Sequence, residues 1–119
     1  MIVDDEQDVQ LLFQQKFRRE IRQNQIQLDF AFSAEEALNY LQNNFHNCLC
    51  LILADINMPG MNGLELLKII KARFPDLKVF IITAYDDDNN YRTAKNYGAD
   101  DYITKPIEFN KLKEKIFSL

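Results

Sequence analysis

The sequence lacks the features that mark several large classes of protein. None of its apolar runs reaches the ~18 residues of a membrane-spanning helix, and its acidic start, MIVDDE, lacks the basic and apolar segments of a signal peptide. Its 14 basic residues are outnumbered by 18 acidic ones, so the net charge of −4 offers no broad cationic surface to nucleic-acid phosphates. We therefore expect a cytoplasmic protein that neither enters a membrane nor binds nucleic acid directly.

Cysteine and histidine, which supply many metal and redox sites, are scarce. The two cysteines, Cys48 and Cys50, fit no zinc-binding spacing, and we expect them to be reduced thiols. The single histidine, His46, lies in the polar connection NNFHNC, where an exposed loop residue is a better interpretation than a phosphate carrier. These residues are therefore not expected to carry the chemistry of the protein.

The chain does contain a regular alternation of apolar and amphipathic segments. With 119 residues, 47% of them apolar, it is long enough for one domain with a real core. Strands are predicted at 2–3, 26–32, 48–55, 78–84 and 101–105, and helices at 11–21, 34–41, 63–74, 86–98 and 109–119. This alternation is typical of a parallel sheet with helices on both faces.

Three local signals refine this pattern. Ser33 and Glu36 form a capping box, so the second helix should begin directly after Ser33. The fourth helix has only a thin apolar stripe, made of Tyr91, Ala94 and Tyr97, and should be the least firmly docked. The first strand is shorter than the usual ~5 residues, and we expect it to be trimmed at the N-terminus.

Polar side chains gather at the carboxyl ends of the predicted strands, where open parallel sheets bind their ligands. The residues at these ends are Asp4, Asp5, Asp55, Thr83 and Lys105. Three carboxylates in one crevice raise one another's pKa values unless a cation lies among them, and oxygen ligands favour Mg²⁺. A metal, an ammonium and a hydroxyl together could bind a phosphoryl group.

Four motifs at these strand ends resemble the receiver domain of two-component response regulators. They are VDDE at 3–6, DINMPGMNGLELL at 55–67, ITA at 82–84 and GADDYITKP at 98–106. The resemblance covers essentially the whole chain. It implies one receiver domain over 1–119, with an α/β fold: a doubly wound five-stranded parallel sheet, flavodoxin-like strand order 2-1-3-4-5, and five helices on both faces.

The resemblance also implies roles for the site residues. Asp55 would be the catalytic aspartate that becomes phosphorylated. Mg²⁺ would be bound by Asp55, by Asp5 and by the backbone carbonyl of Asn57, with Asp4 in its outer shell. Asn57 and Tyr85 would influence how quickly water removes the phosphoryl group.

Further roles follow from the later motifs of the same resemblance. Lys105 would contact the acyl phosphate, and its bond to Pro106 would be cis. Thr83 would bind a phosphoryl oxygen in the active state, while Tyr102 would turn inward as Thr83 moves. Turn chemistry, apart from the resemblance, accounts for Pro59, Gly60 and Gly63, which should shape the loop after the acceptor and start the third helix without a catalytic role.

Together these roles imply a phosphorylation-dependent signalling switch rather than an enzyme with an external substrate. Asp55 would accept its phosphoryl group from the phosphohistidine of a sensor histidine kinase or a phosphotransfer protein. The face formed by the fourth helix, fifth strand and fifth helix would then change and control an output domain or partner. Homodimer formation on phosphorylation is one way in which that face could act.

Two other functions remain open from the sequence. A phosphohydrolase of the haloacid dehalogenase type also uses a strand-end aspartate and Mg²⁺, but it needs a second aspartate where this chain has Asn57. A flavodoxin-like binding module would share the fold, but VDDE at 3–6 would repel a flavin phosphate. Both alternatives therefore require a residue pattern that this chain lacks.

Overall fold

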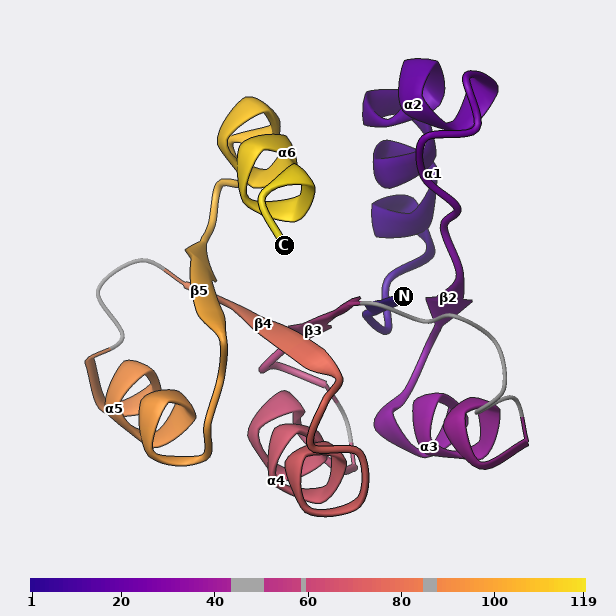
Figure 1. Cartoon of the computed structure of the whole chain (residues 1–119). Coiled ribbons are helices and arrows are strands. Elements are labelled where there is room, and N and C mark those ends of the chain that lie inside the picture. Colours follow the sequence, from indigo (N-terminus) through magenta and orange to yellow (C-terminus); the bar gives the residue numbers. More distant parts are fainter. Residues whose placement is uncertain (44–50, 59, 85–87) are drawn as a thin grey trace.

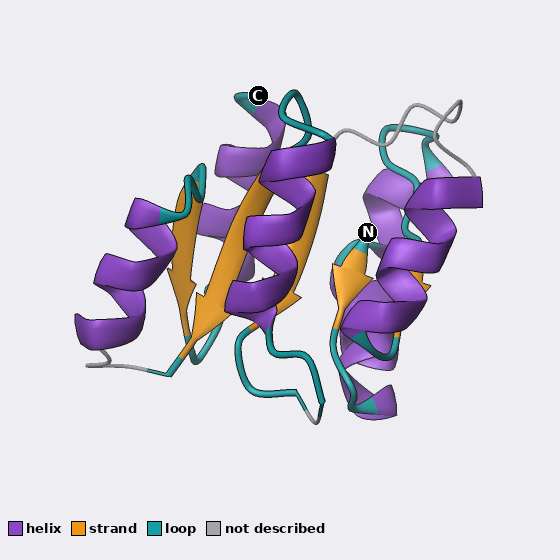
Figure 2. Cartoon of the chain, turned by 90° about the horizontal axis from the view of Figure 1, so that it is seen from below, coloured by secondary structure: helices purple, strands orange, loops and turns teal. Residues whose placement is uncertain are grey.

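The computed structural model describes residues 1–43, 51–58, 60–84 and 88–119. Within them, five parallel strands form one sheet in the order β2-β1-β3-β4-β5 (Figure 1). The strands are β1 Ile2–Val3, β2 Phe30–Ala31, β3 Leu51–Asp55, β4 Lys78–Thr83 and β5 Asp101–Thr104. Their arrowheads point to the same edge of the sheet (Figure 2). The predicted parallel sheet and its strand order are confirmed.

Helices cover both faces of the sheet, as predicted. They are α1 Gln7–Lys16, α2 Arg18–Arg22, α3 Ala34–Asn43, α4 Gly63–Arg73, α5 Asp88–Asn96 and α6 Phe109–Phe117. Helices α1, α2 and α6 lie on one face, and α3, α4 and α5 on the other (Figure 1). Because successive strand side chains point to opposite faces, β4 places Phe80 and Ile82 under α1 and α6, and Val79 and Ile81 under α4.

The first predicted helix, at 11–21, is two helices, so the described residues contain six helices rather than five. The break falls at Phe17, whose backbone (φ −101°, ψ 14°) leaves the helical region. Its ring is fully buried and packs against Phe13 and Phe109, with centroids 5.9 and 6.2 Å away. Packing against α6 therefore accompanies a local turn that sequence periodicity did not indicate.

The second predicted strand, at 26–32, is also shorter in the structure, where β2 contains only Phe30 and Ala31. The reason is its neighbour: β1 pairs with β2 only through Ile2 and Val3, so the ladder has no further partner. The apolar residues before β2 are instead half-buried against the α1 and α6 face. Cys48, Cys50 and His46 lie outside the described residues, so their predicted states stay predictions.

The predicted start of α3 is confirmed. The Glu36 N–H donates to Ser33 Oγ at 3.0 Å, and Glu36 Oε2 accepts from the Phe32 N–H at 3.2 Å. Helix α5 is lightly docked, since Ala94 is its one buried residue and Tyr91 is 45% exposed. None of the described helices combines the length and apolar character needed to cross a membrane.

The turn between β3 and α4 is packed tightly against the end of β3. Asn62 caps α4 by accepting the Glu65 N–H at 2.9 Å, and the Gly63 N–H donates to the Ile56 carbonyl at 3.2 Å. A Cβ added to Gly63 would lie 2.3 Å from the carbonyl oxygen of Asp55. Since that neighbour is backbone, a larger residue at 63 would displace the end of β3.

We predict that Gly63→Ala destabilises the protein by about 1–3 kcal/mol, because the new methyl group clashes with fixed backbone. Urea unfolding at neutral pH measures the change in the free energy of unfolding. Glu65→Ala is the matched control: Glu65 is exposed in the first turn of the same helix, and the expected loss is below about 1 kcal/mol. Equal unfolding curves for Gly63→Ala and the parent would contradict the clash.

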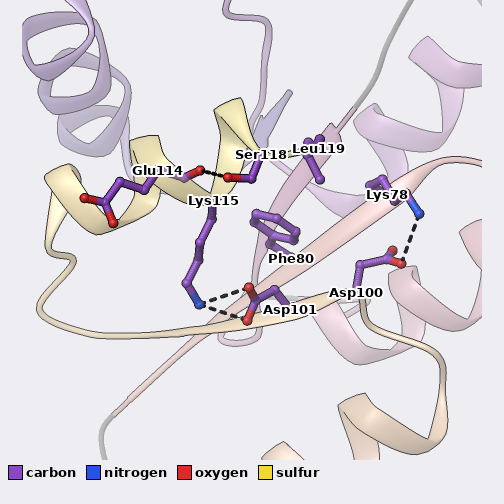
Figure 3. Close-up of a pocket in the computed structure, with 8 residues that line it drawn as sticks. All are labelled: Lys78, Phe80, Asp100, Asp101, Glu114, Lys115, Ser118 and Leu119. Carbon is purple, nitrogen blue, oxygen red and sulfur yellow. Dashed lines mark hydrogen bonds and ion pairs between the residues drawn. The ribbon is translucent and has the colours of Figure 1, made fainter.

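Asp100, directly before β5, interacts with residues of both α4 and β4. Its Oδ2 accepts from Lys71 Nζ at 2.6 Å and from the Val79 N–H at 2.9 Å, while Lys78 Nζ lies 3.9 Å from Oδ1. Figure 3 shows Asp100 and Lys78 beside a pocket of about 480 Å³. Burial alone would raise the pKa of Asp100, but the Lys71 hydrogen bond, the Val79 N–H and Lys78 hold it below its ordinary value.

We predict that Asp100→Asn lowers the free energy of unfolding by about 1–2 kcal/mol at pH 7. Because the folded-state pKa of Asp100 is depressed, its charge stabilises the fold above the unfolded pKa of about 3.9, and that stabilisation is lost as the pH falls through the folded pKa. The difference between parent and variant should therefore shrink as the pH is lowered from 7 towards 3, as measured by urea unfolding. Asp76→Asn, at an exposed position in the preceding turn, should show no such difference.

Candidate functional site

Asp55 is a buried acid at the carboxyl end of β3, only 3% exposed. Lys105 Nζ donates to its Oδ2 at 2.6 Å, and the Asn57 N–H donates to its Oδ1 at 2.9 Å. A carboxylate removed from water is tolerated when it is both paired and hydrogen-bonded. Both oxygens of Asp55 meet this requirement, which fixes the orientation of the side chain.

Asp4, which directly follows β1, brings a second buried carboxyl group to the same place. It is 6% exposed, and its Oδ1 accepts from the Glu6 N–H at 2.9 Å. The pKa of Asp4 is raised to about 6, chiefly by burial; the hydrogen bond and charge of Asp55 also raise it, while the Glu6 N–H and the charge of Lys105 lower it. Lys105 therefore pairs directly with Asp55 and acts on Asp4 through its charge.

Lys105 reaches this group from the end of β5. Its backbone N–H donates to the Thr83 carbonyl at 2.8 Å, and its peptide bond to Pro106 is cis. Burial tends to lower the pKa of Lys105, but the hydrogen bond and charge of Asp55, together with the charges of Asp4 and Glu6, outweigh it and raise that pKa. The ammonium is therefore held in its charged form.

Thr83 ends β4 beside the acid pair. In the ladder Asp55 lies opposite Ile82, so Thr83 is one residue further along the neighbouring strand. Thr83 is 1% exposed, and its Oγ1 has no hydrogen-bond partner in the described part of the chain. A buried hydroxyl without a partner is unfavourable, so it is a group for which an added acceptor would be stabilising.

The remaining predicted site residues lie around this centre. Asp5 and Asn57 are exposed, and Tyr102 is half-buried in β5. Pro59 and Tyr85 lie outside the described residues. Among the described residues, no three carboxylate, imidazole or thiol side chains lie close enough together to hold a metal ion. The structure thus places both Asp4 and Lys105 beside Asp55, and among the described residues it does not add the Asp5 side chain to a three-carboxylate cluster.

The centre nevertheless fits a hard divalent cation with a phosphoryl ligand. Two carboxyl groups near one ammonium leave an excess of negative charge, and the charge of Asp55 adds to the larger effect of burial in raising the pKa of Asp4. All of the available donors are oxygen atoms, which suit Mg²⁺ when a carbonyl, waters and a phosphoryl oxygen complete the shell. The unpartnered Thr83 hydroxyl could donate to such a phosphoryl oxygen.

Sequence reasoning missed two residues that bear on this site. Gly63 was interpreted as loop chemistry, but the structure places it against the carbonyl of Asp55. A signal was present, because glycine is a poor helix former and yet stands at the start of α4. Tyr91 packs on Tyr102 with ring centroids 4.7 Å apart, and no local pattern distinguishes it from an ordinary stripe residue.

Comparison with known proteins agrees with this geometry. The family described as the response regulator receiver domain matches residues 1–117. The chain is 28% identical to sporulation initiation phosphotransferase F of Bacillus subtilis over 116 residues, which are 98% of this chain and 88% of that protein. Among solved structures, the CheY-like receiver domain protein of Methanospirillum hungatei is 34% identical with a TM-score of 0.84, and the alignment covers 98% of this chain and 88% of that one.

Several similar proteins are much longer than this chain. DNA-binding transcriptional regulator NtrC of Proteus hauseri is 34% identical over 110 residues, which are 92% of this chain but 22% of that protein. The matched part is 17% of the length of a cyclic di-GMP phosphodiesterase of Thermotoga maritima, and likewise 17% of response regulator protein FleR of Pseudomonas aeruginosa. With residues 1–117 matched by the family and 98% of the chain covered by the solved structure, the chain belongs to the response regulator receiver domains of two-component systems.

Proposed function

We propose that this domain is a phosphorylation-dependent signalling switch in which Asp55 carries the phosphoryl group. The observation that supports it best is the environment of Asp55: buried, paired with Lys105 at 2.6 Å, and beside a second acid. Three groups surround its carboxylate: the ammonium of Lys105, the Asn57 N–H and the carboxyl group of Asp4. The name of the Bacillus subtilis relative, a phosphotransferase, supports the same class of chemistry.

In the proposed reaction, a carboxylate oxygen of Asp55 attacks the phosphorus of a phosphohistidine on a sensor histidine kinase or phosphotransfer protein. The new O–P bond forms as the P–N bond breaks, and the electron pair of the broken bond stays on the imidazole. The charged ammonium of Lys105 offsets negative charge on the transferring group. The Asn57 N–H keeps the carboxylate oriented while this happens.

A divalent cation completes the proposed site. Asp5, Asp55 and the Asn57 carbonyl would hold Mg²⁺, with Asp4 in its outer shell, and the ion would supply further positive charge to the phosphoryl oxygens. The Asp4 carboxyl, held by the Glu6 N–H, adds negative charge close to Asp55 and so favours binding of a cation. The domain itself would catalyse only its own phosphorylation and dephosphorylation.

The proposed output is a change of the face formed by α5, β5 and α6. Thr83 would move its hydroxyl to the phosphoryl group, and Tyr102 would turn inward beside it. The light docking of α5, which buries only Ala94, supports movement on this face rather than on the α4 side. The changed face would act on an output domain or a partner, and a homodimer is one such arrangement.

We predict that incubation with acetyl phosphate and Mg²⁺ adds one phosphoryl group that is labile to both acid and base. Asp55→Asn should abolish the label, because an amide cannot form the acyl phosphate, and a chelator should also prevent it. Intact-mass analysis measures the added phosphate. Asp8→Asn, at an exposed acid in the first turn of α1, is the matched control and should label as the parent does. Labelling of Asp55→Asn at the parent level would refute the assignment.

We also predict that Asn57→Ala changes the lifetime of the phosphoryl group more than it changes Mg²⁺ affinity. The reason is that the expected metal contact of Asn57 is its carbonyl, which alanine retains, whereas its side chain is exposed two residues beyond Asp55 and would meet the attacking water. Decay of the label after removal of acetyl phosphate gives the lifetime, and metal titration gives the affinity. Equal lifetimes in parent and variant would remove this role of the side chain.

A further inference from the structure

The place of the Tyr102 ring is set partly by an aromatic contact from α5. The ring of Tyr91 meets it edge to face, with centroids 4.7 Å apart and planes at 83°. Tyr91 is 45% exposed, so its own burial contributes little to the core. Since Ala94 is the one buried residue of α5, the Tyr91 contact is a substantial part of what joins this helix to β5.

Thr83 and Tyr102 lie on the same face of the sheet. Tyr102 packs against the core cluster that contains Ile81, and Ile81 is also its partner in the β4–β5 ladder. Thr83 is two residues beyond Ile81, so it shares that face. Thr83 Oγ1 has no hydrogen-bond partner in the described part of the chain, so no hydrogen bond from this hydroxyl opposes its movement.

We propose that Tyr91 is a positioning residue that holds the Tyr102 ring where it lies here and thereby opposes the phosphorylated arrangement. This role rests on the proposed function, because it concerns the same switch. An edge-to-face pair changes an equilibrium by roughly 2- to 10-fold. A ligand that binds only the phosphorylated arrangement must shift this equilibrium away from the present position of Tyr102. Loss of the Tyr91 ring should therefore raise the apparent affinity for that ligand by the same 2- to 10-fold.

The first test titrates the full chain with fluoroberyllate, a phosphoryl analogue, in excess Mg²⁺. Tyr91→Ala should bind it about 2- to 10-fold more tightly than the parent, while Tyr91→Phe, which keeps the ring, should bind like the parent. Leu12→Ala is the control for loss of an exposed apolar side chain, because Leu12 is 40% exposed in α1 on the opposite face of the sheet, and it should leave the affinity unchanged. Tyr91→Leu keeps apolar volume without a ring and replaces the alanine variant if that variant unfolds.

The second test observes Tyr102 directly, without Mg²⁺ or fluoroberyllate. The tyrosines are labelled with 3-fluorotyrosine, and the ¹⁹F resonance of Tyr102 is assigned by its loss in Tyr102→Phe. That resonance should shift in Tyr91→Ala and stay in place in Tyr91→Phe, because it reports the neighbouring ring and the position of Tyr102.

Three results would overturn the role of Tyr91. They are an unchanged or weaker affinity in Tyr91→Ala, an unmoved Tyr102 resonance in that variant, or the same changes in Tyr91→Phe, which retains the ring. Failure of the proposed function has a different signature, because the parent would then bind no fluoroberyllate, or Asp55→Asn would bind it equally. The ¹⁹F measurement would still decide whether Tyr91 positions Tyr102.

Discussion

Burial of Asp55 removes a charge from water at the end of β3, and the arrangement around it follows from how that charge is satisfied. The ammonium comes from Lys105, which follows β5, so the order β3-β4-β5 must bring that strand end within reach across β4. The second oxygen is satisfied by the Asn57 N–H, which requires the chain to turn immediately after the strand. Gly63 then permits the returning chain to pass against the Asp55 carbonyl. Sheet order and turn thus supply the partners that one buried carboxylate requires, and the glycine makes room for that turn.

Helices α4 and α5, which lie on the same face of the sheet, differ in how firmly they are packed. Helix α4 buries a run of large apolar side chains, Leu64, Leu66, Leu67 and Ile70. Helix α5 buries only Ala94, and just after its end the Tyr97 ring lies under the Lys68 ammonium of α4 at 5.4 Å. Regions with few buried contacts open at lower free energy than the core. Asp55, at the end of β3, therefore lies beside the firmly packed α4, and its surroundings can keep their geometry while α5 adjusts.

The parts of the fold that could be predicted are those that depend on local pattern. Apolar runs ending in polar residues identified β3 and β4, and the capping box at Ser33 fixed the start of α3. The length of β2 depends instead on how many residues its partner β1 offers, and the break at Phe17 coincides with packing against Phe109 from the far end of the chain. The same distinction holds at the site: strand ends indicated Asp55 and Lys105, whereas the Tyr91 contact exists only once α5 packs on β5.

Two small free energies of similar size oppose each other around Thr83. Its buried hydroxyl lacks a partner, and such a group is unfavourable by about 1–3 kcal/mol until an acceptor arrives. The edge-to-face contact of Tyr91 with Tyr102 favours the present arrangement by about 0.5–1.5 kcal/mol. A switch needs two arrangements separated by only a few kcal/mol, so that one added charge reverses their populations. If the hydroxyl were satisfied at rest, or if α5 were packed as deeply as α4, one phosphoryl group would have far more to overcome.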